Sequence, residues 1–407
     1  MTLHRRAFIK GTALASAGLA LDPFRLSAGG AAGATGRTGP TRPGAGPEDR
    51  PSTATPRPPT LQEAHGKATH SILEEDHPWI FIDACMQMWP DADFHLAHRH
   101  GVTTYAVTAW DPHATPESAM EEILYWHWVA GEYPNLPLVR TAADIRRAKR
   151  EGKAGLLLAA QDGDWLGLEL HRLKAFHDLG LRMMLFAYNA TNQLAGGCLD
   201  RTDGGLTRFG RMVVDECDRL GIVLDCSHVA RRSTLEIMEL SANPCVFSHS
   251  NPSAVVPNPR NIDDDQIAAC ARGGGVVGVC SWGPLVMKPG TTARPTVDDY
   301  IDLMDHVAQL TGTIEAVGMS TDMSIGTYPQ HESDPWGAIP FPDITRQYDE
   351  HVTSDITSPE RNVEGFDDYA LVVGLAERLS NRGYSDHEIR AVLGENFLRV
   401  FREVWGA

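Results

Sequence analysis

The chain has 407 residues, a hydrophobic content of 42% and a formal net charge of −17 at pH 7. This composition is that of a globular protein with enough apolar residues for a buried core. The excess of acidic residues argues against nucleic acid or an anionic membrane as a partner, because such surfaces bind basic patches.

The N-terminal segment has the pattern of an export signal. Arg5 and Arg6 precede Phe8, and a weakly apolar run rich in Ala and Gly follows over residues 11–21. This pattern predicts a twin-arginine signal peptide over residues 1–33. We therefore expect a bacterial protein of the periplasm or the cell exterior, with the twin-arginine translocase as a partner during export. The apolar run is too short to span a bilayer, and we expect no transmembrane segment in the mature chain.

A tether is predicted after the signal. Residues 34–60 are mostly Gly, Pro, Thr, Ala and Arg with almost no large apolar side chain, a composition that cannot form a packed core. Residues 61–407 are predicted to form one domain that ends in helices. The chain has seven cysteines, and because this number is odd and most lie in apolar runs, we expect buried thiols rather than a disulfide framework.

Eight short apolar runs follow the tether and are predicted to be strands. They cover residues 79–85, 102–110, 154–161, 182–188, 221–227, 244–249, 274–281 and 316–322. Amphipathic stretches such as 206–220 and 297–310 separate them, which is typical of a parallel sheet covered by helices. Eight repeats predict a (β/α)8 barrel of the α/β class. An open doubly wound sheet is the alternative, but no Gly-rich phosphate-binding loop follows the first strand.

Polar residues at the strand ends are the candidates for chemistry, because barrels of this kind place their sites at the carboxyl ends of the strands. These positions are Cys85, Gln87, Trp110, Gln161, Tyr188, His228, His249, Trp282 and Asp322. Imidazole and carboxylate groups are ordinary zinc ligands, so His228, His249 and Asp322 together favour a metal site over loop residues that only satisfy the backbone. Asp162, Asp164 and Trp165 follow the third strand and either contact substrate or cap the next helix.

Several motifs in the same order resemble the membrane (renal) dipeptidase family. They are LDCSH (224–228), VFSHS (246–250), PRN (259–261), GMSTD (318–322) and GENFLRVF (394–401). The stretch from residue 188 to 211 is similar to a bacterial branch of that family. The resemblance implies a metal-dependent amidohydrolase barrel with two bridged zinc ions that cleaves dipeptides. Some members of the family are dimers, so the resemblance is compatible with a homodimer.

The resemblance also assigns roles to single residues. It implies that His228 and His249 bind zinc and that Asp322 is the acidic group at the eighth strand, serving as a metal ligand and as the general base. Tyr188 stands where the family has a histidine that holds the reacting carbonyl, and it can still donate a hydrogen bond. The residues expected to bind substrate are Arg260, Trp282 and Asn261.

Three positions depart from the family pattern. The family's first strand ends in His-x-Asp and its third in a bridging glutamate, whereas this chain has Cys85, Gln87 and Gln161. The retained ligands suffice for one tetrahedral zinc with a water but not for a dinuclear pair. Cys85 is either an additional ligand or a packing residue.

Two functions remain open at this point. The first is a zinc hydrolase that acts on a dipeptide or another small amide. The second is a barrel without metal that binds or matures a small exported peptide such as a siderophore, because the metal-site residues are altered. A purely structural protein is disfavoured, because it gives no reason for polar strand-end residues to gather.

Overall fold

The computed structural model describes residues 79–95, 97–326, 342–356 and 358–406. The predicted signal peptide (1–33), the predicted tether (34–60) and residues 61–78 lie outside the described residues. No helix in the described ranges is both long enough and apolar enough for a membrane span.

All eight predicted strands are present and in the predicted order. All are parallel, and each overlaps one predicted run. They are β1 (Ile82–Met88), β2 (Thr104–Thr108), β3 (Gly155–Ala160), β4 (Leu181–Leu185), β5 (Val223–Asp225), β6 (Val246–Phe247), β7 (Val276–Cys280) and β8 (Val317–Ser320). A two-residue strand, β9 (Ser324–Ile325), follows β8 and was not predicted.

The segment that contains β8 and β9 closes the sheet into a ring. β8 pairs with β7, and β9 pairs in parallel with β1. The backbone N–H of Asp322 donates to the carbonyl of Cys85, and the N–H of Gln87 donates to the carbonyl of Met323, both at 2.9 Å. The fold is therefore the predicted (β/α)8 barrel, and the carboxyl ends of its strands form one rim.

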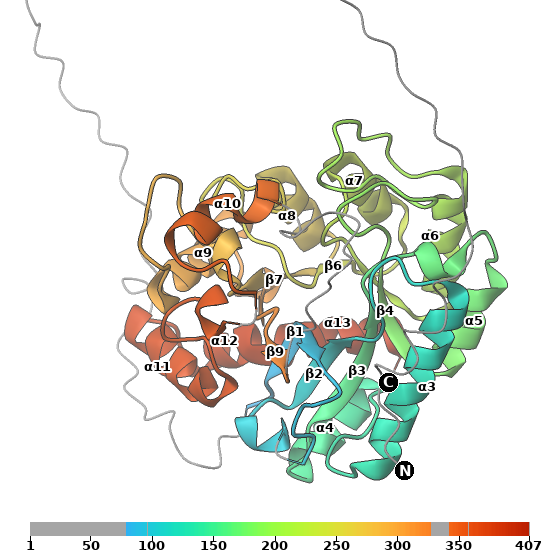
Figure 1. The fold of residues 1–407 in the computed structure, drawn as a ribbon, viewed down its shortest axis with the longest axis horizontal. Helices are drawn as coiled ribbons and strands as arrows, with labels where there is room; N and C mark the ends of the chain where they lie inside the picture. The colour runs from blue at the N-terminus through green and yellow to red at the C-terminus, as the bar shows by residue number, and fades with distance from the viewer. Residues whose placement is uncertain (1–78, 96, 327–341, 357, 407) are drawn as a thin grey trace, which may run out of the picture. The chain divides into compact units, whose positions relative to one another are not determined.

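Helices surround the strands (Figure 1). They are α3 (Pro116–Glu132), α4 (Ala142–Arg150), α5 (His171–Asp178), α6 (Arg208–Leu220), α7 (Arg231–Leu240), α8 (Asp264–Arg272), α9 (Val297–Thr311), α10 (Pro342–His351), α11 (Val372–Arg382), α12 (Asp386–Arg390) and α13 (Asn396–Trp405). Short 3₁₀ segments lie at Ala97–His100, Asp164–Leu166, Gly283–Leu285, Ile314–Ala316, Pro359–Arg361 and Tyr369–Leu371, and a π-turn at Ala391–Glu395. Threonine caps start the two helices foreseen from the sequence, α6 and α9, because their hydroxyls accept otherwise unpaired backbone N–H groups.

Helix α13 packs across the amino end of the barrel. Its Asn396 side chain donates to the carbonyls of Ile314 and Val317 at the start of β8, and its Phe397 is fully buried among the inward-facing side chains of the strands. A β-carbon on Gly318 would lie 2.4 Å from the Phe397 ring, so glycine is required there. Within the described residues, α13 therefore fills the amino end of the barrel, and the candidate site residues lie at the carboxyl rim.

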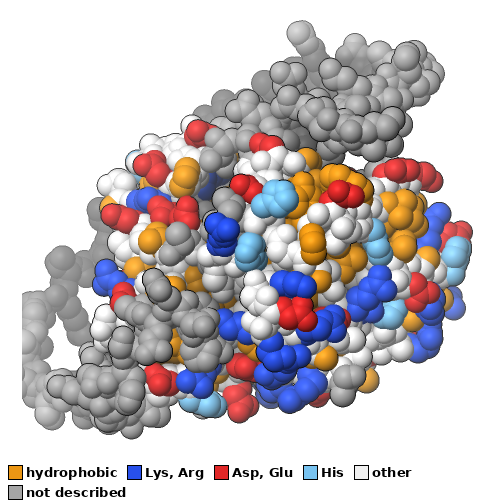
Figure 2. Space-filling view, turned by 90° about the horizontal axis from the view of Figure 1, so that it is seen from below, with side chains coloured by type: hydrophobic (Ala, Val, Ile, Leu, Met, Phe, Trp, Pro, Cys, Tyr) orange, Lys and Arg blue, Asp and Glu red, His pale blue; other side chains and the backbone are white. Residues whose placement is uncertain are grey.

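The surface carries charges of both signs. On the face in Figure 2, Lys and Arg side chains lie among Asp and Glu side chains rather than in a uniform basic field. All seven cysteines are free thiols, six of them buried, which confirms the prediction of thiols without disulfides.

Candidate active site at the carboxyl rim of the barrel

The two histidines after β5 and β6 face each other. The Nε2 atoms of His228 and His249 are 2.8 Å apart, and both side chains are buried. The Nδ1–H of His228 donates to the amide oxygen of Asn189 at 2.7 Å, which leaves the lone pair on Nε2. The Nδ1 of His249 lies 2.6 Å from the hydroxyl of Ser248, which can donate or accept. In each ring the Nδ1 atom is hydrogen-bonded to a neighbouring side chain and the Nε2 atom faces the other histidine, an arrangement that is also found in metal-binding histidines.

Burial keeps both imidazoles neutral. Loss of water lowers the pKa of His228 and of His249 well below the usual value of 6.5, and the positive charge of Arg260 lowers both further. A neutral imidazole is the form that binds metal. In a tetrahedral zinc site with bonds of 2.0–2.1 Å, two nitrogens lie about 3.3 Å apart. At the observed 2.8 Å the two Nε2 atoms are at hydrogen-bond distance, so one of them carries a proton, and a zinc ion would replace that proton and move the two nitrogens apart by about half an ångström.

Asp322 lies beside this pair. Ligand atoms of Asp322, His249 and Cys85 all fall within 4.8 Å of one another. Burial raises the pKa of Asp322, while a hydrogen bond from Gln87 and the charge of Arg260 lower it. The structure therefore brings His228, His249 and Asp322 together, and their role as ligands stays a prediction.

Two of the three replaced positions bond to each other, and the third bonds to Asp322. The Nε2 of Gln161 donates to the Sγ of Cys85 at 2.9 Å, and the Nε2 of Gln87 donates to the Oδ1 of Asp322 at 2.6 Å. Burial and the neighbouring Asp322 raise the pKa of the Cys85 thiol well above 9.0. An amide carries no charge and is a poor bridge between two dications, so Gln87 and Gln161 do not supply the ligands of the family's dinuclear pair, whereas Cys85 lies within reach of a cation at His249 and Asp322.

Tyr188 and Arg260 border the histidine pair. The Tyr188 ring stacks on His228 with ring centroids 4.1 Å apart. Arg260 is buried, and its guanidinium donates to the Ser250 hydroxyl at 2.9 Å and to the His249 carbonyl at 2.7 Å. Arg260 and His228 line a cavity of about 280 Å³. Arg260 is therefore a fixed part of the rim rather than a surface residue.

The other two predicted substrate residues have different surroundings. Asn261 lines the cavity beside His228, and its side-chain amide donates to the carbonyls of Val256 and Leu285. Trp282 is half-buried, and the Arg361 guanidinium lies 5.5 Å from its ring centroid. Trp282 does not line the cavity beside His228. Contact of Asn261 or Trp282 with substrate stays a prediction.

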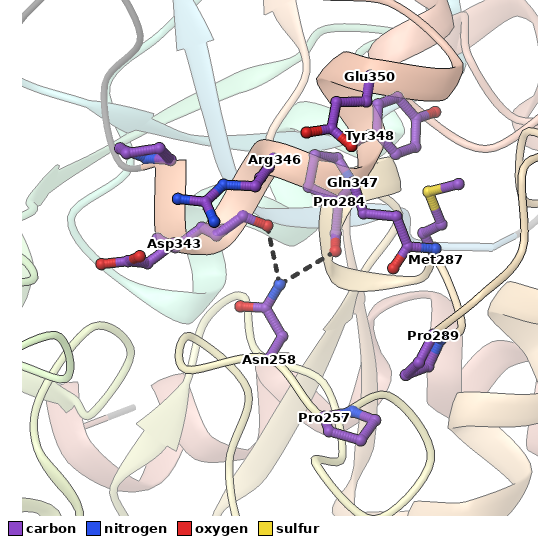
Figure 3. Close-up of a pocket in the computed structure, with 12 residues that line it drawn as sticks. Pro257, Asn258, Pro284, Met287, Pro289, Asp343, Arg346, Gln347, Tyr348 and Glu350 are labelled. Atoms are coloured by element: carbon purple, nitrogen blue, oxygen red, sulfur yellow. Dashed lines mark hydrogen bonds between the residues drawn. The ribbon is translucent and has the colours of Figure 1, made fainter. Parts of the chain in front are cut away.

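A second cavity, also of about 280 Å³, lies between the loops after β6 and β7 and helix α10 (Figure 3). Asn258 joins its walls by donating to the carbonyls of Pro284 and Ile344. None of the histidines or carboxylates of the centre lines this cavity. It is therefore separate from the histidine pair.

Sequence reasoning missed the residues that orient the histidines, and it missed His113 as the partner of Asp162 and Asp164 on the rim. Asn189 and Ser248 hydrogen-bond to the two imidazoles. In the sequence, the one sign of this role is position, because Asn189 follows the fourth predicted strand and Ser248 lies in the sixth. His113, after β2, approaches Asp162 and Asp164, after β3. Their separation of about 50 residues gives no local signal.

Comparison with known proteins agrees with this barrel and rim. The model of the membrane dipeptidase family (peptidase family M19) matches residues 96–338. Dipeptidase 3 of Mus musculus is 28% identical over 293 residues, which are 70% of this chain and 51% of that protein, and dipeptidase 3 of Rattus norvegicus is equally similar. The chain thus spans about half the length of the curated relatives that it matches.

Solved structures show the same fold. An amidohydrolase from Pseudomonas aeruginosa superimposes with a TM-score of 0.70 at 29% identity, covering 82% of this chain and 98% of that one. A metallopeptidase from Rhodobacter sphaeroides, bound to a phosphinate mimic of L-Ala-D-Ala, has a TM-score of 0.65 at 19% identity, covering 80% and 99%. The match over more than half of the chain and the shared barrel lead to one conclusion: this chain belongs to the membrane dipeptidase family.

Proposed function

We propose that this chain is a metallohydrolase that cleaves a dipeptide or a similar small amide with one zinc ion held by His228, His249 and Asp322. The observation that carries the proposal is the pair of neutral, buried imidazoles whose Nε2 atoms face each other beside Asp322. In the described part of the chain no acidic side chain is hydrogen-bonded to either imidazole, and a cation would displace the proton that the two Nε2 atoms share.

The chemistry follows from the groups on the rim. A bound zinc ion would supply a water of lowered pKa and polarise the carbonyl of the substrate. Asp322, whose own pKa burial raises, would accept the proton of the attacking water and pass it to the leaving amine. Arg260 would bind the carboxylate of the substrate, since two of its N–H groups are used within the loop and the guanidinium has five. Tyr188 would donate a hydrogen bond to the reacting carbonyl.

The size of the site and the buried Arg260 support a small substrate that carries a carboxylate. The cavity of about 280 Å³ beside His228 has room for a molecule of dipeptide size, and its lining is of mixed charge, with Arg231 and Arg260 as well as Asp200, Asp203 and Asp263. The arginine pair near the N-terminus supports action in the periplasm or outside the cell.

One observation favours the second candidate, a barrel that binds or matures a small exported peptide without metal. The bonds from Gln161 to Cys85 and from Gln87 to Asp322 give these polar groups partners within the protein. Such a protein would keep the carboxylate-binding Arg260 and lose hydrolysis.

Elemental analysis of the purified chain and of the double variant His228→Ala/His249→Ala separates the two candidates. The hydrolase should bind zinc and turn over a member of a dipeptide and N-acyl amino acid panel that includes L-Ala-D-Ala. The double variant should lose both the zinc at this centre and the turnover. The matched control replaces two exposed histidines, His171→Ala/His387→Ala, and should change neither. Turnover at the parent rate by the double variant would show that the proposed centre is wrong.

A further inference from the structure

A second cluster of metal-binding side chains lies on the loops after β2 and β3. The Nδ1 of His113 is 2.7 Å from the Oδ2 of Asp164 and 3.7 Å from the Oδ2 of Asp162. The ligand atoms of the three residues all fall within 4.8 Å of one another. Such a compact set of one imidazole and two carboxylates is compatible with a cation at its centre.

An unpartnered buried oxygen points to that cation. The Asp162 side chain is fully buried, and its Oδ2 accepts the backbone N–H of His113. Its Oδ1 has no hydrogen-bond partner within the described ranges of the chain. A buried carboxylate oxygen without a donor is costly unless a cation or a proton binds it, and burial together with the charge of Asp164 raises the pKa of Asp162 to about 7. The nearby Asp164 carries a second negative charge, which strengthens the attraction of the cluster for a cation.

The cluster is open to solvent on one side. The side chain of His113 is 37% exposed and that of Asp164 is 27% exposed. A cation could therefore reach the cluster and keep water on its remaining coordination positions. One imidazole nitrogen and two carboxylate oxygens suit Zn²⁺ or Mn²⁺, while the absence of a thiolate from the set disfavours copper(I).

We propose that His113, Asp162 and Asp164 form a binding site for a divalent cation that is separate from the centre at His228, His249 and Asp322. The Tyr188 ring lies between the two groups, with its centroid 6.2 Å from that of His113 and 4.1 Å from that of His228. Both sites are therefore on the same rim of the barrel, one aromatic side chain apart. The second site lies on the loops after β2 and β3, and none of its three residues is a replaced ligand position, although Asp162 directly follows Gln161 in the chain.

The test counts cations in variants that separate the two sites. Chelator-treated full-length protein is titrated with Zn²⁺ and, in parallel, with Mn²⁺ observed by electron paramagnetic resonance. The His228→Ala/His249→Ala variant should retain about one binding site per chain. Adding His113→Ala and Asp164→Asn, both at partly exposed positions, should weaken that site by about 100-fold or more, because two ligands are lost. Asp162→Asn should have the same effect where thermal unfolding shows that the variant folds.

The matched control is His306→Ala/Asp264→Asn, which removes another His–Asp pair, 2.8 Å apart, and should leave binding unchanged. If His228→Ala/His249→Ala alone abolishes all binding, or if His113→Ala/Asp164→Asn binds as the parent does, the cluster is an ion pair and the proposal is wrong. These outcomes do not depend on hydrolysis, so loss of the proposed function would leave this test intact.

Discussion

Four residues other than glycine in the described part of the chain have a positive φ, and all four lie in loops at the carboxyl rim. They are His113 (65°), Asn189 (62°), His228 (60°) and Asp322 (56°). Each such conformation costs on the order of 1–3 kcal/mol when a β-carbon is present, and strain of this kind gathers at functional sites. Two of these residues belong to the proposed zinc centre, one supports it, and one belongs to the proposed second cation site.

Gln161 offers a direct test of the altered metal site. Its Nε2 donates to Cys85 and to Thr108, where the resembling family has a bridging carboxylate. Gln161→Glu keeps the shape and adds an anionic ligand, so the affinity for Zn²⁺ should rise about tenfold, equivalent to about 1.4 kcal/mol. Competition with a chelating dye measures the affinity for Zn²⁺. Gln347→Glu, at an amide that bonds only backbone carbonyls, is the control, and an equal effect there would contradict a specific role of Gln161.

Asp83 predicts a pH-dependent stability. Burial raises its pKa from 3.8 to about 6, although Thr321 and Tyr369 donate hydrogen bonds to it. Because the folded state holds the proton more tightly, the stability contributed by this group is present below pH 3.8 and is lost as pH rises through about 6. In metal-free protein, the unfolding free energy of wild type minus that of Asp83→Asn should fall by up to about 3 kcal/mol between pH 4 and pH 7. Urea unfolding at each pH measures the difference, and a constant difference would contradict the raised pKa.

At the scale of elements, the barrel is closed at one end by a helix and open at the other. Helix α13 contacts the starts of several strands: Arg399 donates to the carbonyl of Gly274 before β7, and Trp405 donates to the carbonyl of Arg182 in β4. The strands are only two to seven residues long, so they depend on this packing for their geometry. The rim is thus held from the opposite end of the barrel.

Phe397 is the residue of α13 on which this packing depends most. Phe397→Ala removes a fully buried ring that contacts the inward face of the sheet, and the unfolding free energy should fall by about 3–5 kcal/mol. Leu168→Ala, at a side chain that is 71% exposed, should change it by less than about 0.5 kcal/mol. Denaturant unfolding measures the unfolding free energy of both variants. A similarly small change in both would mean that packing of α13 against the amino end of the barrel is not essential for stability.

At the scale of the whole molecule, closure of the barrel brings segments that are far apart in the sequence into contact. Cys85 and Asp322 are 237 positions apart in the chain, yet the closure of β1 against β8 and β9 places their side chains in contact. With two proposed cation sites on the carboxyl rim, we expect two bound metal ions per chain. The family resemblance assigns the residues of one of these sites, at His228, His249 and Asp322, and not those of the other.

Bound metal should therefore stabilise the whole barrel. A ligand present at 1,000 times its dissociation constant stabilises the folded state by about 4 kcal/mol, so treatment with a chelator should lower Tm by on the order of 10 °C, and Zn²⁺ should restore it. The His228→Ala/His249→Ala variant should show a smaller shift, because it keeps only the second site. An unchanged Tm after chelation of the parent protein would contradict both cation sites.

The sequence by itself determined the class of fold, the order of the eight strands and the histidines at the ends of β5 and β6. These follow from apolar runs and their spacing, which are local properties of the chain. Family resemblance added the expectation for Asp322 and Arg260.

Only the tertiary structure decided which partners those residues have. Asn189 behind His228, Gln161 against Cys85, and His113 against Asp162 are contacts between loops far apart in sequence. The added strand β9 is likewise set by pairing with β1 rather than by its own two residues. Closure of the barrel fixes these neighbours, and no local pattern of side chains encodes which loops will meet.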